Sequence, residues 1–338
     1  MSEHKQTERG GYPLWVPNLT HFKPGAPGGV DQNRIAAQIA HLRPHVSRFL
    51  LAGSTGDGWE IDDTAFAALI ELAQDGTVFP GETRLMFGAL RPTTDAVIAR
   101  ARLVEERLAK GPKLAAQAVG HAVCPPVEPG ASQETILDHY RRVLRETEMP
   151  IAVYQLPQVT QCAISVETMR ALADEPKVVM FKDSSGEDAV AKAGATKGVL
   201  ALRGAEGRYS AWVAPDGPYD GWLLSSGNSV PELLDATARH LASGETAAAA
   251  EASAKASQIV DRLFAAAAPL TFGNAFSNAN RAADHIRAWG PKWRAVEPPL
   301  TASGNRLPET LLAEADAILK DGGIDVTSGY LDAEGVSV

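Results

Sequence analysis

Eight short apolar runs, separated by longer amphipathic segments, constrain the fold of this 338-residue chain more than any other feature. Each run is bounded by glycine, proline or charged residues, a pattern typical of strands that are buried on both faces of a sheet. The runs are residues 12–20, 47–54, 84–90, 113–123, 150–157, 177–182, 198–204 and 220–227. We therefore predict eight buried strands.

The segments between these runs have the periodicity of amphipathic helices. Ser132 is an N-cap candidate for one such helix, and Lys110-Gly111 has the composition of a helix end. Helices are predicted within residues 33–42, 64–76, 93–111 and 132–148. The alternation predicts an α/β protein with a closed (β/α)8 TIM barrel, although an open doubly wound sheet would give much the same one-dimensional pattern.

The pattern changes near residue 231, beyond which only helical segments follow. Glycine and proline mark breaks between these segments at 268–274 and 296–305. The helical segments are residues 235–267, 274–290 and 308–323. We divide the chain into a flexible N-terminal tail (1–11), a barrel (12–230) and a C-terminal helical region packed on the barrel (231–338).

Composition narrows the class of protein. The formal net charge of −9 argues against nucleic acid or an anionic membrane surface as a partner, because no basic surplus exists to neutralise phosphates. The two cysteines, Cys124 and Cys162, are too few for a disulfide framework and are expected to be small buried hydrophobes. No uncharged apolar stretch reaches the roughly 18–20 residues of a membrane helix, and no secretion signal is evident, so we expect a cytoplasmic protein.

The apolar run 177–182 ends on a lysine, which is unusual for a strand buried on both faces. Strand alternation places Val178, Met180 and Lys182 on one side. One interpretation is a snorkelling lysine with a solvated ammonium. The other is a desolvated amine that acts as a nucleophile, since functional residues of such barrels lie at the carboxyl ends of the strands. Lowering its pKa to roughly 7 requires on the order of 4–5 kcal/mol, which burial can supply.

Two further strand ends carry groups that suit the same chemistry. The loop "GSTGDG" at 53–58 has backbone donors and the hydroxyls of Ser54 and Thr55, which could bind a carboxylate; an ordinary βα turn is the alternative. The loop is not a phosphate loop, because no Gly-Lys-Ser/Thr follows. Tyr154 is a candidate proton carrier beside an imine or, alternatively, a core tyrosine.

The remaining candidates are less specific. Gly204 to Glu206 and the serines at 225 and 226 follow the last two strands, and Glu128 lies in a proline-rich loop at the same rim. Glu206 either contacts substrate hydroxyls or is an exposed surface residue. His121 lies within a strand-like run and is interpreted as structural.

Four stretches together resemble the dihydrodipicolinate synthase / N-acetylneuraminate lyase family of class I aldolases: "GSTGD" (53–57), "YQLPQVT" (154–160), "FKDSSGE" (181–187) and "DGWLLSSGN" (220–228). The resemblance covers roughly residues 12–322. It implies a TIM barrel with a C-terminal helical region, assembled as a homodimer or homotetramer, that acts on a 2-oxo acid without a metal or organic cofactor.

The same resemblance implies roles for individual residues. Lys182 matches the lysine that forms a Schiff base with pyruvate or another 2-oxo acid, and Tyr154 matches the family's tyrosine. Gly53, Ser54 and Thr55 match the loop that binds the substrate carboxylate, with Ser54 as a proton relay. Gly204, Glu206, Ser225 and Glu128 are expected to contact the substrate, and no metal ligands are expected.

Departures from the family pattern predict a different substrate. Val159 stands where an arginine of the synthases binds the second substrate, and Pro126-Val127-Glu128 stands where they have P-Y-Y. A valine cannot make the bidentate contact that an arginine makes with a carboxylate. We therefore predict a Schiff-base lyase for a 2-oxo or 2-oxo-3-deoxy acid, by aldol cleavage, condensation or dehydration, rather than a true dihydrodipicolinate synthase. The alternative is a non-catalytic 2-oxo acid binding or sensing relative.

Overall fold

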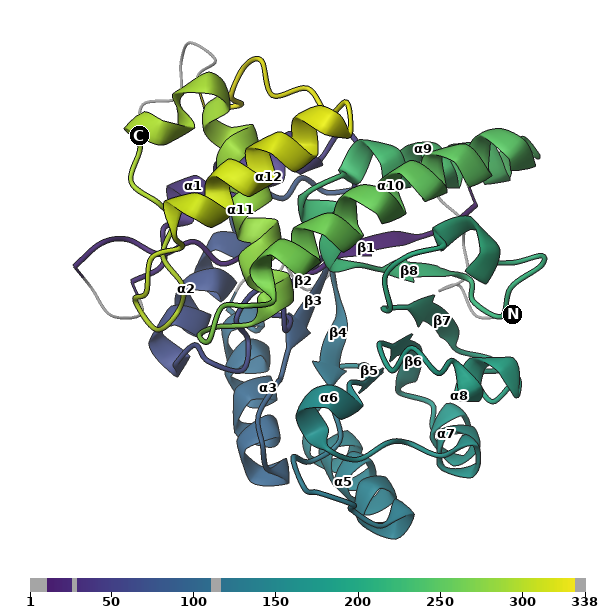
Figure 1. Ribbon diagram of the computed structural model, residues 1–338. Helices are drawn as coiled ribbons and strands as arrows, with labels where there is room; N and C mark the ends of the chain where they lie inside the picture. The colour runs from purple at the N-terminus through teal and green to yellow at the C-terminus, as the bar shows by residue number, and fades with distance from the viewer. Residues whose placement is uncertain (1–10, 26–28, 111–116, 332–338) are drawn as a thin grey trace.

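The protein folds around a closed barrel of eight parallel strands (Figure 1). The computed structural model describes residues 11–25, 29–110 and 117–331. The strands are β1 (Leu14–Val16), β2 (Arg48–Leu51), β3 (Arg84–Gly88), β4 (Ala118–Val123), β5 (Ile151–Gln155), β6 (Val178–Asp183), β7 (Leu200–Arg203) and β8 (Gly221–Leu223). Each pairs with the next in the chain, and β8 pairs with β1. The prediction of a TIM barrel is confirmed, and the open sheet is excluded.

Helices alternate with the strands and cover the outside of the barrel. The longer ones are α1 (Gln32–Leu42), α2 (Asp63–Ala73), α3 (Thr94–Leu108), α5 (Gln133–Glu146) and α7 (Val166–Ala173). Shorter helices lie between the later strands: α6 (Pro157–Thr160), which precedes α7, then α8 (Ala189–Lys192) and a 3-10 helix, η2 (Tyr209–Trp212). Gly194, with φ of 62°, follows α8 by two residues and adopts the left-handed backbone that ends a helix. The side chain of Ser132 caps α5, as predicted.

Side chains fill the barrel interior, so the barrel is a packed core and not a pore. Each strand contributes to a buried apolar cluster that closes the interior: Trp15, Leu50, Met86, Ala122, Ala152, Met180, Leu202 and Leu223. Lys182 follows Met180 by two residues on β6 and therefore lies on the same inward face, nearer the carboxyl ends of the strands. The interior cluster thus forms the floor beneath Lys182.

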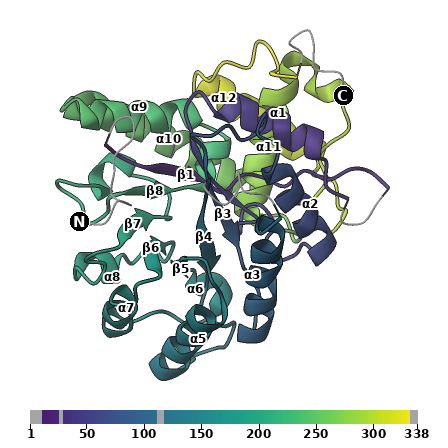
Figure 2. The same ribbon diagram turned by 180° about the vertical axis from the view of Figure 1, so that it is seen from behind.

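The C-terminal region consists of α9 (Pro231–Ala242), α10 (Thr246–Ala267), α11 (Ala275–Trp289), the 3-10 helix η4 (Gly290–Ala295) and α12 (Glu309–Asp321). The alanine-rich run expected at 235–267 is two helices, because the chain turns at Gly244 with φ of 73°. Helix α11 lies against the 3-10 helix η3 (Ser225–Asn228) that follows β8. It also lies beside α1 (Figure 2), to which it is joined by an ion pair between Arg34 and Asp284. The helical region is therefore in direct contact with the barrel.

Some predictions fall on parts of the chain that are not described. Residues 1–10 of the expected tail, the start of the predicted strand 113–123 and Gly111 lie outside the described residues, as do residues 332–338. Within the described ranges, no helix combines the length and apolar character that a membrane crossing requires.

Candidate active site

Lys182 lies at the carboxyl end of β6 with its amine inside the protein. It pairs in register with Tyr154 on β5 and with Leu202 on β7, and only 4% of the residue is exposed. Its Nζ atom is 3.9 Å from the centroid of the Tyr154 ring. Burial lowers the pKa of this amine to about 7, although nearby Cys124 and Glu206 act in the opposite direction. The snorkelling interpretation is therefore wrong: this ammonium does not reach bulk water.

Tyr154 forms one apolar wall beside the lysine. Its ring packs with Leu90, Cys124 and Leu156, and Val159 packs against this cluster. Burial raises the pKa of the phenol far above its ordinary value, although the side chain of Ser184 acts in the opposite direction. The phenol therefore stays protonated at neutral pH. Burial likewise raises the pKa of the Cys124 thiol, so Glu206 is the remaining negative charge that acts on Lys182.

Gly204 allows β7 to approach the lysine closely. A Cβ atom at this position would lie 2.8 Å from Cε of Lys182 and would also collide with Oγ of Ser184. Any larger residue would displace one of these side chains. The glycine therefore fixes where the lysine stem can lie.

Glu206 follows Gly204 and is half-buried, so the interpretation as an exposed surface residue is wrong. Its Oε1 accepts hydrogen bonds from Ser225 Oγ (2.7 Å) and the Ser226 N–H (3.1 Å). Its Oε2 accepts from Ser226 Oγ (2.6 Å) and the Tyr209 hydroxyl (3.0 Å). Loops after β7 and β8 are thereby joined around one carboxylate.

The 53–58 loop follows β2, which lies across the barrel from β6 in the closed strand order. Ser54 and Thr55 are buried, at 7% and 6% exposure. Ala52 has a left-handed backbone with φ of 52°, and its carbonyl oxygen occupies the space that a Cβ of Gly58 or Gly88 would need. These two glycines are therefore required by close approach. Within the described residues, no group bonds to the Thr55 side chain.

Helix α11 and its N-cap contact this loop through hydrogen bonds. Asn274, its N-cap, donates from Nδ2 to Ser54 Oγ over 3.3 Å, and Ser277 Oγ donates to the Ser54 carbonyl over 3.4 Å. Further along the helix, the buried Arg281 pairs with the buried Asp57. We did not predict Asn274 and Arg281 as site residues. The sequence does predict a helix that begins at residue 274. It does not show that this helix contacts a loop 220 residues earlier in the chain, because such a contact leaves no periodic pattern in the sequence.

Glu128 is not brought to the lysine. Its side chain is exposed, and its N–H donates to the Thr160 carbonyl over 3.2 Å in the loop after β4. His121 is buried and faces outward to Glu105 on α3, with 3.1 Å between Nε2 and Oε1, which confirms its structural role. Cys124 and Cys162 are buried free thiols, as predicted.

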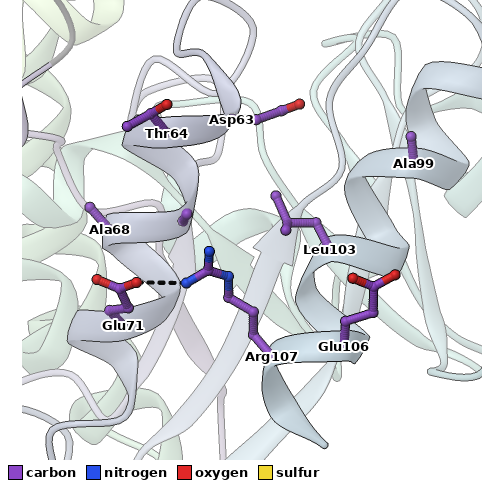
Figure 3. A pocket seen from close by; sticks show the side chains of 9 residues that line it. Asp63, Thr64, Ala68, Glu71, Ala99, Leu103, Glu106 and Arg107 are labelled. Atoms are coloured by element: carbon purple, nitrogen blue, oxygen red, sulfur yellow. Dashed lines mark hydrogen bonds and ion pairs between the residues drawn. The ribbon is translucent and has the colours of Figure 1, made fainter. Parts of the chain in front are cut away.

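Two further features of the molecule delimit the site. In the ranges that the structure describes, no three His, Cys, Asp or Glu side chains are grouped so as to hold a metal ion. A groove of about 630 Å³ lies on the outside of the barrel between α2 and α3, where Arg107 pairs with Glu71 (Figure 3). This groove contains none of the residues at the barrel mouth.

A closed parallel barrel with a buried lysine at the end of β6 defines this chain as a TIM barrel with a desolvated amine at its mouth. A sequence model of the Dihydrodipicolinate synthetase family matches residues 106–285, more than half of the chain, and the protein belongs to this family.

Individual relatives are distant. A 4-hydroxy-tetrahydrodipicolinate synthase of Azoarcus sp. (strain BH72) is 24% identical over 294 residues, which cover 85% of this chain and 89% of the relative. YagE, a prophage protein of the dihydrodipicolinic acid synthase family from E. coli K12 whose crystal structure contains pyruvate, superposes with a TM-score of 0.77 at 18% identity and covers 93% of this chain and 99% of its own. KD(P)GA from T. tenax superposes with a TM-score of 0.71 at 18% identity and covers 92% and 99%.

Proposed function

We propose that this protein is a class I lyase that forms a Schiff base between Lys182 and a 2-oxo or 2-oxo-3-deoxy acid. The observation that carries the proposal is the buried amine of Lys182 at the barrel mouth, 3.9 Å from the Tyr154 ring centroid. With a pKa of about 7, roughly half of this amine is unprotonated at neutral pH, whereas an ordinary lysine is almost entirely protonated.

In the proposed reaction, the lone pair of Lys182 Nζ attacks C2 of the 2-oxo acid. The resulting carbinolamine loses its oxygen as water, leaving an iminium. Aldol cleavage then removes the proton of the C4 hydroxyl and breaks the C3–C4 bond, whose electron pair moves into the iminium to give an enamine and a free aldehyde. Protonation at C3 and hydrolysis release pyruvate. Loss of water, which breaks a carbon–oxygen bond instead, is the dehydratase variant.

The other mouth residues receive roles in this reaction. Tyr154, protonated and next to Nζ, carries a proton to and from the departing oxygen. Ser54 and Thr55 bind the 2-carboxylate, with Gly53 shaping the loop, and Ser54 relays protons. Ser225 and Gly204 line the side of the pocket opposite the 53–58 loop. Glu128 contacts the substrate only if its loop moves inward, since its side chain is exposed.

The proposed substrate class follows from the absence of an arginine at position 159. Val159 packs on the apolar cluster around Tyr154. It stands where dihydrodipicolinate synthases, which this chain resembles, have an arginine. It offers no charge to the carboxylate of a second substrate, which favours a lyase other than a dihydrodipicolinate synthase. We further propose a cytoplasmic homodimer or homotetramer that needs no metal or organic cofactor.

Borohydride trapping tests the proposal. The protein is incubated with pyruvate, reduced with sodium borohydride, digested and analysed by mass spectrometry. An adduct is expected on Lys182, none on a Lys182→Met variant, and an unchanged adduct on the control Lys197→Met, which alters an exposed lysine. Absence of an adduct on Lys182 with pyruvate and with a panel of 2-oxo acids would overturn the proposal.

The exposed position of Glu128 and the apolar Val159 favour one second candidate, a relative that binds 2-oxo acids without turnover. Such a protein would be stabilised against thermal unfolding by 2-oxo acids but would release no pyruvate from 2-oxo-3-deoxy acids. Measurable release of pyruvate excludes it.

A further inference from the structure

The carboxylate of Glu206 is saturated with hydrogen bonds. Three hydroxyls and one backbone N–H donate to its two oxygens, which is about the number of acceptor sites that a carboxylate has. A substrate hydroxyl would therefore find no free acceptor on Glu206. What Glu206 offers the barrel mouth is its charge, and not a hydrogen-bonding site.

This charge is held in a fixed place. Arg203 Nη1 donates to the carbonyl oxygens on either side of Glu206, those of Ala205 (2.9 Å) and Gly207 (3.1 Å). Arg203 is itself held by the buried Asp188, with 3.0 Å between Nε and Oδ1. Glu206 therefore cannot turn away when the amine next to it gains or loses a proton.

Three arginines around the described part of the mouth are each already paired with a carboxylate. Arg91, after β3, lies 3.7 Å from Asp63 and donates to the carbonyls of Gly58 and Ile61, and Arg281 on α11 is paired with Asp57. Arg203 is committed to Asp188 and the 205–207 backbone. In the proposed reaction, the iminium on Lys182 is balanced by Glu206, and the loop donors receive the 2-carboxylate.

We infer that Glu206 acts as a charge filter, which makes the site selective for 2-oxo acids whose only anionic group is the 2-carboxylate. A second carboxylate on the substrate tail would meet the fixed Glu206 charge in a site screened little by solvent, and would lose affinity. The inference rests on the proposed function, because it concerns substrates bound at Lys182. It assigns neutral tails, such as alkyl or hydroxylated chains and aldehydes, to the distal part of the pocket.

The test compares two 2-oxo acids of equal carbon number. Initial rates of borohydride trapping on Lys182 are measured with 2-oxopentanoate and with 2-oxoglutarate, whose tail carries a second carboxylate. We expect the wild type to trap 2-oxopentanoate at least about tenfold faster at equal concentration. In Glu206→Gln, which keeps the size and one acceptor oxygen but removes the charge, this ratio should fall severalfold. The control Glu167→Gln, which removes a carboxylate that is 81% exposed on α7, should preserve it.

A second variant keeps the inference falsifiable if Glu206→Gln does not fold. Val159→Arg adds a cation to the cluster around Tyr154 and leaves Glu206 and its four hydrogen-bond donors unaltered, and it should raise trapping of 2-oxoglutarate relative to 2-oxopentanoate. If wild-type protein traps pyruvate but has a ratio near one, if a folded Glu206→Gln leaves the ratio unchanged, or if Val159→Arg does not change it, the charge filter is refuted and the proposed function stands. If pyruvate itself is not trapped, the proposed function fails first.

Discussion

The two walls of the barrel mouth are built in different ways. The wall with Lys182, Tyr154 and Glu206 comes from consecutive strands β5 to β8 and their loops, so its parts are neighbours in the sheet. The opposite wall, the loop at 53–58, is held by Asn274 and Arg281 of helix α11, more than two hundred residues later. The wall proposed to perform chemistry is thus internal to the barrel, while the wall proposed to bind the carboxylate depends on the C-terminal region.

The largest expected effect concerns the first wall. Lys182→Met should abolish the trapped adduct and at the same time stabilise the protein. The folded-state pKa of about 7 lies below the ordinary 10.5, so the unfolded chain binds more protons between these pH values, and stability is lost as pH falls from about 10.5 towards 7. At pH 7, removal of this penalty is worth on the order of 3–5 kcal/mol.

Urea unfolding at pH 7 and pH 10.5 measures this effect. The gain in stability of Lys182→Met over wild type should shrink at the higher pH, and Lys197→Met should show no gain at either. If Lys182→Met is less stable than wild type at pH 7, burial of the amine does not destabilise the folded state and the prediction is wrong.

The second prediction breaks the other wall. Arg281→Met leaves the buried carboxylate of Asp57 without its partner, which should cost about 3–5 kcal/mol of unfolding free energy. The double variant Asp57→Asn/Arg281→Met should recover much of that loss, because no uncompensated charge remains. Urea unfolding of the single and double variants checks this; equal losses in both would mean that the pair does not act as a unit.

A finer prediction separates substrate binding from helix capping. Asn274→Asp keeps the N-cap acceptor but replaces the amide donor to Ser54 with a negative charge facing the carboxylate loop. We expect KM for the 2-oxo acid to rise about tenfold with little change in kcat and in thermal stability. As a control, Ser165→Ala removes the N-cap of α7 and should cost about 1 kcal/mol without changing KM. Comparable KM for Asn274→Asp and wild type would show that α11 does not influence substrate binding by the 53–58 loop.

The smallest expected effect is a shift in pH dependence. Trapping should rise about tenfold per pH unit up to about pH 7 and level off above it, since the neutral amine is the nucleophile. Because Glu206 raises the pKa of Lys182, Glu206→Gln should move the midpoint to lower pH. Rates measured from pH 5.5 to 8.5 at constant ionic strength test this; a wild-type midpoint near the ordinary lysine value would contradict burial as the controlling factor.

The sequence predicts the barrel and places the candidate residues at its mouth, but it does not predict which helix supports the 53–58 loop. Buried parallel strands are continuous apolar runs, and the rule that function lies at their carboxyl ends selects Lys182, Tyr154 and Ser54 without any structure. Periodicity carries no information on which distant helix contacts a loop, so Asn274 and Arg281 were missed. Glu128 was proposed from its position in a motif, but the side chain of a rim loop can point to solvent, as this one does.

The close approach of Gly204 to the lysine stem limits how this protein can be redesigned. Position 204 offers an engineer no room to reshape the pocket, because even a methyl group there would collide with Cε of Lys182, the carbon that carries the amine. Alterations of substrate range are better directed at Val159, which packs on the cluster around Tyr154 and belongs to α6, outside the strand that carries Lys182.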